Sequence, residues 1–303
     1  MKQTFYSNGK LLITGEYVVL NGAKALALPT KFGQNLIIEP AQNKTFYWTS
    51  YDADGTIWFE AEITFETVIT KKQSQENKIE DTLIEILNEA YSLNPNFINN
   101  SQGYKVTTEL TFPKFWGLGT SSTLINNIAQ WLQINPYKLL KKTFGGSGYD
   151  IACAQNDSAL LYQLENQNPK IEPIIFHPTF SENIYFIYLN KKQSSKSAIA
   201  SYYKKQVSIG TTITIIDSLT EIISTTNDIQ EFTSAIKKHE IEMSKVLEIS
   251  TVQETLFADF DGVIKSLGAW GGDFVMAITK ENPTEYFLQK GYKTILPYQD
   301  MIL

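Results

Sequence analysis

The chain has 303 residues, of which 43% are hydrophobic and 19% are charged, with a net charge of −6 and one cysteine. This composition predicts a globular protein of one large domain or two ordinary ones, and the acidic balance disfavours nucleic acid as a partner. A single cysteine excludes an intramolecular disulfide and fits a reducing compartment. The apolar run at residues 11–14 is too short for a signal peptide or a membrane span, so we expect no membrane partner and a cytoplasmic location.

The basic residues are unusual because all 26 of them are lysines. A chain without arginine cannot offer the two-pronged guanidinium group that often binds phosphate. Any bound phosphate is therefore expected to rest on lysines, hydroxyls and backbone N–H groups.

The first third of the chain is predicted to be rich in strands. Asn21-Gly22 is a strong signal for a tight turn between the first two strands, and residues 52–55 favour a hairpin. Asp52 and Asp54 are expected to stabilise that hairpin turn, because the ligand spacing of a calcium site is absent. The predicted strands are residues 5–20, 25–28, 35–39, 46–50 and 56–63.

The middle of the chain alternates helices and strands. Residues 79–91 have the apolar spacing of an amphipathic helix that stops before Asn94-Pro95. The predicted elements that follow are a strand at 104–111, a helix with apolar positions between 124 and 132, a helix at 137–143, a strand at 158–163 and a loop at 166–170.

Between the strand at 104–111 and its helix lies a segment with two glycines, Gly117 and Gly119, and three hydroxyls, Thr120, Ser121 and Ser122. Glycines let backbone approach a ligand closely, and a helix N-terminus presents unpaired N–H groups and a positive dipole. This combination suits an anion, above all a phosphate. An ordinary glycine turn with a hydroxyl N-cap explains the segment equally well when it is considered alone.

From about residue 171 the pattern restarts, which predicts an α+β chain of two lobes. The predicted strands are residues 171–176, 183–189, 274–278 and 294–296, and the predicted helices are residues 196–208, 212–225, 229–247, 251–267 and 284–290.

Two further glycine clusters stand beside regular elements. Residues 144–148 lead to Asp150, which either serves a ligand or caps the helix that begins at Ile151, and residues 268–273 form the third cluster. Three such clusters indicate that several backbone segments converge on one phosphorylated ligand. The P-loop, dinucleotide, zinc-protease and serine-hydrolase signatures are all absent.

The clusters and their order resemble the GHMP kinases, the family of galactokinase, homoserine kinase, mevalonate kinase and phosphomevalonate kinase. Residues 9–17 are similar to the family's first motif, residues 117–122 to its second and residues 268–274 to its third. The resemblance covers almost the whole chain. Phosphomevalonate kinases are most similar, and the loop at 190–196 looks more like mevalonate kinase.

This resemblance implies a two-lobed α+β fold. An ATP-binding N-terminal lobe, like domain 2 of ribosomal protein S5, would span residues 1–177, and a ferredoxin-like lobe would span residues 178–303. It also implies an ATP-dependent kinase that uses Mg²⁺, has a small-molecule substrate and acts as a monomer or homodimer.

The resemblance further implies roles for individual residues. Asp150 would orient the acceptor hydroxyl or take its proton, and Lys10 would stabilise Asp150 and the charge on the transferred phosphoryl group. The residues implied to bind ATP are Lys114, Gly117, Leu118, Gly119, Thr120, Ser121 and Ser122, with the Ser121 hydroxyl facing Mg²⁺. The residues implied to bind the substrate are Glu16, Tyr17, Ser147, Gly148, Lys196, Gly271 and Gly272.

Two departures from the family pattern keep the function open. No Asp or Glu lies between Glu109 and Asp150, where relatives usually provide an acidic Mg²⁺ ligand, so Mg²⁺ would rest on Ser121, phosphates and water. Trp116 and Trp270 replace small residues and could either stack on a ligand or fill the nucleotide space. The leading prediction is a mevalonate or phosphomevalonate kinase. The alternatives are a kinase for another small alcohol, such as a sugar or homoserine, and a catalytically weak protein of the same fold with a binding or regulatory role.

Overall fold

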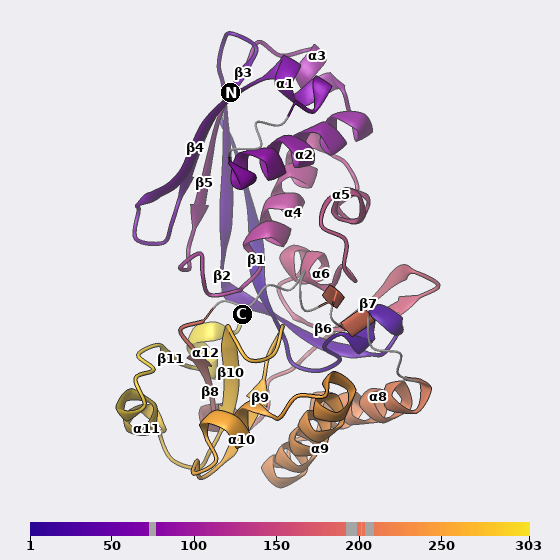
Figure 1. The fold of residues 1–303 in the computed structure, drawn as a ribbon, viewed down its shortest axis with the longest axis vertical. Helices are drawn as coiled ribbons and strands as arrows, with labels where there is room; N and C mark the ends of the chain where they lie inside the picture. Colours follow the sequence, from indigo (N-terminus) through magenta and orange to yellow (C-terminus); the bar gives the residue numbers. More distant parts are fainter. Residues whose placement is uncertain (73–76, 192–198, 201, 204–208) are drawn as a thin grey trace. The chain divides into compact units, whose positions relative to one another are not determined.

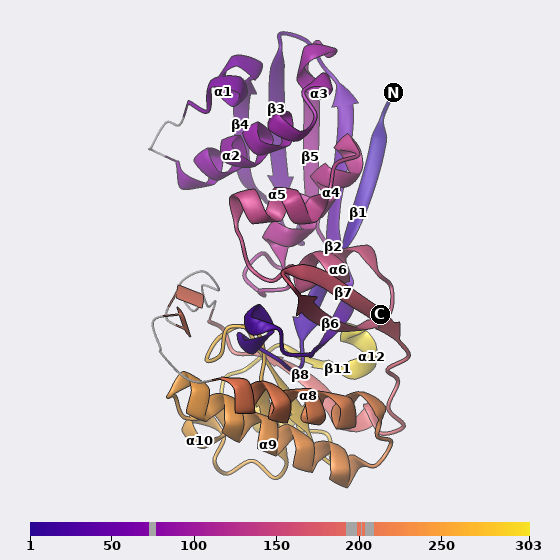
Figure 2. The ribbon, with the colours of Figure 1, turned by 90° about the vertical axis from the view of Figure 1, so that its right-hand side faces the viewer.

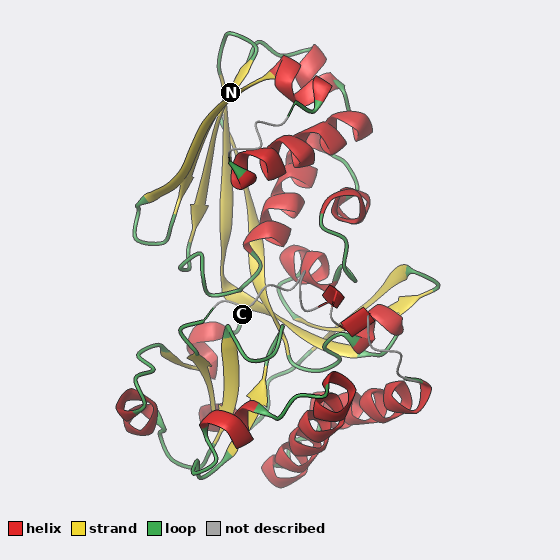
Figure 3. Ribbon diagram, viewed as in Figure 1, coloured by secondary structure: helices red, strands yellow, loops and turns green. Residues whose placement is uncertain are grey.

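The computed structural model describes residues 1–72, 77–191, 199–200, 202–203 and 209–303. It confirms a mixed α+β fold (Figures 1 and 3). By contacts the chain forms two compact units, each made of several segments. Unit 1 comprises Met1–Gly9, Phe32–Lys114 and Leu118–Gln155, and unit 2 comprises Lys10–Lys31, Phe115–Gly117 and Asn156–Leu303. The lobe boundary expected after residue 177 stays a prediction.

Unit 1 is built on a mixed sheet. Its strand order is β4-β3-β5-β2, and β1 also pairs with β2. The pairs β3–β4 and β2–β5 are antiparallel, whereas β3 and β5 run parallel. The predicted hairpin is confirmed, with Trp48 opposite Ala61. The strands are β1 (Gln3–Leu12), β2 (Ala25–Pro40), β3 (Thr45–Tyr51), β4 (Ile57–Thr64) and β5 (Tyr104–Leu110).

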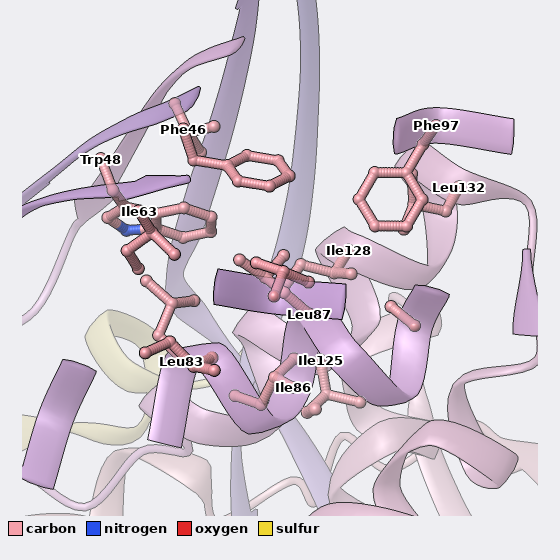
Figure 4. Packing of buried hydrophobic residues seen from close by; sticks show 14 of the residues in the cluster. Phe46, Trp48, Ile63, Leu83, Ile86, Leu87, Phe97, Ile125, Ile128 and Leu132 are labelled. Carbon is pink, nitrogen blue, oxygen red and sulfur yellow. The ribbon is translucent and has the colours of Figure 1, made fainter. Parts of the chain in front are cut away.

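Helices α2 and α4 lie against one face of this sheet (Figures 1 and 2). Figure 4 shows Trp48 and Ile63 of the sheet, Leu87 of α2 and Ile128 of α4 in one hydrophobic cluster. Burial of these apolar side chains fixes α4 on the sheet, and with it the glycine segment that precedes the helix. The helices of unit 1 are α1 (Phe65–Thr70), α2 (Lys78–Leu93), α3 (Asn96–Asn99), α4 (Thr120–Leu132), α5 (Pro136–Thr143) and α6 (Tyr149–Gln155).

The prediction of a strand over residues 5–20 is wrong beyond Leu12. A 3₁₀ helix, η1 (Val18–Asn21), follows instead and ends at Gly22, whose φ is 91°. Short buried apolar runs do not distinguish a strand from a helix, and here both Val18 and Val19 are buried. Conversely, residues 25–28 and 35–39 belong to one continuous strand, β2, and α1 was not predicted.

Unit 2 contains a hairpin of β6 (Ala159–Glu165) and β7 (Asn168–Ile174), with Ala25–Ala27 of β2 paired to β6. A second, antiparallel sheet has the order β11-β8-β10-β9. Its strands are β8 (Ile184–Tyr188), β9 (Val263–Ser266), β10 (Phe274–Ile278) and β11 (Ile295–Pro297). Besides η1, the helical elements among the described residues of unit 2 are η2 (Ser181–Asn183), α8 (Gly210–Thr225), α9 (Ile229–Leu247), α10 (Val252–Leu256), α11 (Thr284–Gln289) and α12 (Tyr298–Met301). Helices α8 and α9 lie side by side (Figure 2).

The helix predicted at 229–247 is confirmed as α9, which is capped by Asp228. The helix predicted at 251–267 is wrong after Leu256, because residues 263–266 form β9. All four residues of β9 are buried against β10 and α9, so tertiary packing decides their conformation. The predicted helix at 196–208 lies mostly outside the described residues. Among the described helices, none has the length and apolar composition needed to cross a bilayer.

Candidate functional site

The N-terminus of α4 in unit 1 has the features of an anion site. Gly119 is the N-cap residue with a φ of 99°, and no side chain caps the helix. The first turn contains no acidic residue, and the Ser121 side chain is exposed. The hydroxyls of Ser122 and Thr123 donate to the Gly119 carbonyl at 2.9 and 3.1 Å. The alternative of an ordinary hydroxyl N-cap is therefore wrong, because the cap is a glycine and the first-turn hydroxyls turn back to its carbonyl group.

A buried polar network holds α4 in place within unit 1. Thr123 Oγ1 donates to Gln34 Oε1 at 2.8 Å, and Asn127 Nδ2 donates to the Gln34 carbonyl at 2.9 Å. Ser7 Oγ donates to Asn127 Oδ1 at 2.7 Å and accepts from Asn126 Nδ2 at 2.9 Å. The apolar spacing of this helix predicted only an amphipathic element, although the two consecutive asparagines near its middle were a signal of polar burial.

The second glycine cluster of unit 1 leads into α6. Gly145, Gly146 and Gly148 have φ values of 69°, 94° and 89°, and an added Cβ at Gly145 or Gly146 would meet no atom within 4 Å. These two glycines are therefore required by backbone conformation and not by crowding. Asp150 lies in the first turn of α6, where its Oδ1 accepts from the Ile151 N–H at 3.1 Å.

The surroundings of Asp150 include the phenol of Tyr137 in α5. Burial raises the pKa of Tyr137 far above its ordinary value, and the charge of Asp150 adds to that rise. Ser147 and Gly148 precede Asp150 in the same segment, so three predicted site residues are neighbours in unit 1.

Lys10 lies in a small pocket of unit 2. Its Nζ donates to the Gly117 carbonyl at 2.9 Å. The pocket is lined by residues of all three family-like motifs, namely Lys10, Leu11, Leu12, Trp116, Gly117, Leu267, Gly268, Asp273 and Phe274. Within unit 2 the fold therefore brings together segments that are far apart in sequence.

Asp273 is a residue of this pocket that was not singled out in the sequence. An ideal Cβ on Gly117 would lie 2.4 Å from Asp273 Cγ, so the carboxylate occupies the space that a side chain at position 117 would need. Burial raises the pKa of Tyr17, and the charges of Glu16 and Asp273 add to the effect. The position of Asp273 in the third glycine cluster was the sequence signal that could have identified it.

Glu16 is a predicted substrate residue whose side chain is buried in unit 2. Its Oε1 accepts from Lys265 Nζ, and its Oε2 lies 3.5 Å from His239 Nε2. Burial raises the Glu16 pKa to about 7, although Lys265 acts in the opposite direction. Lys265 and His239 were not predicted, and a lone lysine within the apolar run at 263–267 was the available signal.

Lys114 ends the part of unit 1 that precedes the glycine segment. Its backbone N–H donates to Asp52 Oδ1 at 2.9 Å, and its Nζ lies 5.5 Å from the centre of the Trp58 ring. Asp52 Oδ1 also accepts from the Ala53 N–H at 2.8 Å. The predicted turn role of Asp52 is confirmed, and the same carboxylate also fixes the start of the glycine segment.

Both unusual tryptophans pack within unit 2. Trp116 meets the Phe274 ring edge-on at 5.4 Å, and Trp270 is buried beneath Lys265, whose Nζ is 5.8 Å from the ring centre. In the same cluster Gly271 is exposed and Gly272 is buried. Lys196 lies outside the described residues.

Comparisons with known proteins define the class of the fold. No protein-family model and no curated protein sequence matches the chain. Solved structures match over nearly its full length. The Lin0012 protein from Listeria innocua matches with a TM-score of 0.73 and 16% identity, over 98% of this chain and 97% of that one.

Two further matching structures are those of kinases. Streptococcus pneumoniae phosphomevalonate kinase in complex with phosphomevalonate and AMPPNP has a TM-score of 0.69 and 16% identity, covering 99% and 98% of the two chains. A D-glycero-D-manno-heptose 1-phosphate kinase from Bacteriodes thetaiotaomicron has a TM-score of 0.68 and 14% identity, covering 100% and 96%. Mevalonate kinases and a galactokinase also match. The protein has the fold of the GHMP kinases.

Proposed function

We propose that this chain is an ATP-dependent phosphotransferase, with mevalonate or phosphomevalonate as its acceptor. The observation that carries the proposal is the N-terminus of α4, where a glycine N-cap, first-turn N–H groups without a side-chain cap and no acidic residue form a cradle for phosphate. The fold shared with kinases of small molecules supports the same assignment.

The proposed roles follow from the chemistry of phosphoryl transfer, which depends mainly on positioning and charge stabilisation. The N–H groups of residues 117–122 bind the ATP phosphates, and Lys10 supplies a positive charge. Asp150 accepts the proton of an acceptor hydroxyl. If the acceptor is itself a phosphate, proton removal matters little, and Lys114 and Lys196 become more important.

The described residues of the α4 N-terminus offer one proposed side-chain ligand for Mg²⁺, the Ser121 hydroxyl. The Ser121 hydroxyl is exposed at the α4 N-terminus, and no group of three or more His, Cys, Asp or Glu side chains that could hold a metal occurs among the described residues. Mg²⁺ commonly keeps several waters and binds mainly through substrate phosphates, so one hydroxyl is compatible with it. When bound, Mg²⁺ neutralises phosphate charge.

Calorimetry with Mg·AMPPNP and with AMPPNP alone is the first test. We expect metal-dependent binding by the native chain and weaker binding after Ser121→Ala. Absence of binding at millimolar nucleotide would contradict the kinase assignment. It would favour the alternative of a catalytically weak protein of this fold with a binding or regulatory role.

Turnover with mevalonate, phosphomevalonate and galactose then identifies the acceptor. For an alcohol acceptor, Asp150→Asn should lower kcat by roughly a hundredfold or more, because general base catalysis contributes on that order. Asp81→Asn is the matched control, since Asp81 also lies in the first turn of a helix of unit 1.

Two lysine variants test whether the acceptor carries a phosphate. We expect Lys114→Ala and Lys196→Ala to raise the acceptor KM if it does, and an unchanged KM in both would remove support for a phosphate-bearing acceptor. The galactokinase among the structural matches makes a sugar the second candidate acceptor.

A further inference from the structure

Lys265 of β9 is a fully buried lysine in unit 2. Its Nζ donates to Glu16 Oε1 and lies 3.0 Å from Glu240 Oε1 in α9. Its Nζ also donates to the Ser266 carbonyl, and Ser266 Oγ donates to Glu240 Oε2 at 2.9 Å. One buried cation therefore joins β9, α9 and the segment that follows β1.

Such a cluster is a poor way to gain stability. Desolvation of buried charges offsets most of their mutual attraction. Well-packed apolar residues of similar volume often give a protein of equal or greater stability. Burial disfavours the charge on Lys265, but its two carboxylate neighbours favour it more strongly, so its pKa is raised. The cluster is better explained by the segments that it fixes in position.

The first of these segments is Gly15–Tyr17. The Gly15 N–H donates to His239 Nε2 at 3.1 Å, and burial lowers the pKa of His239 well below its ordinary value. His239 is therefore neutral and acts as an acceptor. Gly15 is also crowded, because an added Cβ would lie 2.8 Å from the Cβ of Ala25.

The second segment is the third glycine cluster. Trp270 lies beneath the Lys265 ammonium group and belongs to the same hydrophobic cluster as Tyr17. Tyr17 and Trp270 have backbone φ values of 62° and 50°, which residues other than glycine rarely adopt. Such backbone persists only where the surroundings impose it, and it concentrates at functional sites.

We propose that Lys265 is a positioning residue that holds the segments 15–17 and 268–273 in the conformation needed to bind the acceptor. The proposal rests on the proposed function, because these segments contain the predicted substrate residues Glu16, Tyr17, Gly271 and Gly272.

Lys265→Met tests this role, because methionine preserves most of the side-chain volume and removes the charge. We expect the acceptor KM to rise roughly tenfold to a hundredfold, since displaced binding groups cost about that much, while the Kd for AMPPNP changes by a much smaller factor. Hydrogen exchange should become faster in both segments.

Two controls separate positioning from general loss of stability. Lys245→Met removes an exposed ion pair with Glu242 in the same unit. Phe287→Leu damages a different hydrophobic cluster of unit 2 and should lower the Tm without changing the acceptor KM. If Lys265→Met does not fold, the double variant Glu240→Gln with Lys265→Met, which leaves the predicted substrate residue Glu16 unchanged, is measured instead.

The two proposals fail in distinguishable ways. If the native chain neither binds AMPPNP nor turns over an acceptor, the proposed function is wrong, whatever the variants do. If the native chain is active and Lys265→Met leaves the acceptor KM unchanged, the positioning role is wrong. It is also wrong if Phe287→Leu raises that KM to the same extent, or if exchange in residues 268–273 is not altered by Lys265→Met.

Discussion

At the scale of single residues, Gly117 is constrained by two independent features. Its φ is 71°, and an added Cβ would lie 2.4 to 2.7 Å from the carboxylate atoms of Asp273. Its carbonyl also accepts from Lys10 Nζ. Position 117 therefore excludes any side chain, first because of its backbone conformation and second because of a neighbouring charge.

Gly117→Ala should lower both the stability of the protein and its affinity for AMPPNP. The left-handed backbone costs about 1–2 kcal/mol for a non-glycine residue, and displacement of Asp273 adds to that cost. Urea unfolding and calorimetry measure the two effects.

Gly145→Ala is the matched control, because Gly145 has a φ of 69° but an added Cβ would have no neighbour within 4 Å. The excess cost of Gly117→Ala over this control should disappear in the background of Asp273→Ala. Equal costs at positions 117 and 145 in the native background would show that Asp273 does not constrain the loop.

At the scale of elements, α4 is anchored by polar groups as well as by its apolar face. Asn127 bonds with both the Ser7 hydroxyl of β1 and the Gln34 carbonyl of β2, and all of these groups are buried. Hydrogen bonds are directional, so this network sets the rotation of the helix about its axis, whereas apolar packing alone tolerates small rotations. The first turn of α4 is the proposed phosphate cradle.

Asn127→Ala should lower the free energy of unfolding by about 2 kcal/mol or more, because it leaves buried polar partners without a hydrogen bond. The loss is expected even though alanine has the higher helix propensity. The affinity for AMPPNP should fall as well.

Gln130→Ala provides the comparison on the same helix. Gln130 is exposed, and its Nε2 donates to the Tyr6 carbonyl at 3.1 Å and to Ser7 Oγ at 3.3 Å, so its loss should have a smaller effect on both quantities than the loss of the fully buried Asn127. Similar stability losses at positions 127 and 130 would contradict a dominant role for the buried network.

At the scale of the whole molecule, the charges buried in unit 2 should make stability depend on pH. The folded pKa of Glu16 is about 7 against an ordinary value of 4.5, so its contribution to stability is lost as the pH rises from 4.5 to 7. The pKa of His239 is lowered by burial, so its contribution to stability is lost progressively as the pH falls from the ordinary value of 6.5 toward the lowered pKa of the folded state. Glu16 and His239 therefore have opposite effects on the pH dependence of stability, over overlapping ranges of pH.

Glu16→Gln removes the contribution of the Glu16 carboxyl group to this pH dependence and leaves that of His239. The stability of this variant relative to the native chain should therefore increase between pH 4.5 and 7. The slope of this increase should be at most about 1.4 kcal/mol per pH unit. Urea unfolding at a series of pH values measures it.

Glu221→Gln is the control, because Glu221 is an exposed partner of Lys24 and its pKa is lowered, not raised. It should show no such trend above pH 4.5. A constant difference between Glu16→Gln and the native chain would mean that the Glu16 carboxyl does not change protonation in this range.

Local features of this protein could be read from sequence because they depend on neighbouring residues. The period of apolar residues located α2, α4 and α9, and turn residues located the β3–β4 hairpin. The glycines and hydroxyls at 117–122 identified a candidate phosphate cradle, and the order of the motifs indicated the fold. Apart from the order of the motifs, which is read along the whole chain, these signals act over one or two turns, so no tertiary information is needed to read them.

Other features were decided only by tertiary structure. Glu16 meets Lys265 across 249 residues, and Asp273 fills the space beside Gly117 across more than half the chain. Residues 263–266 form a strand because β10 and α9 surround them, although their sequence had suggested the end of a helix. The reason is that the partner of a buried charge and the conformation of a short apolar run depend on the groups packed against them. Those groups come from distant segments whose approach the local pattern does not encode.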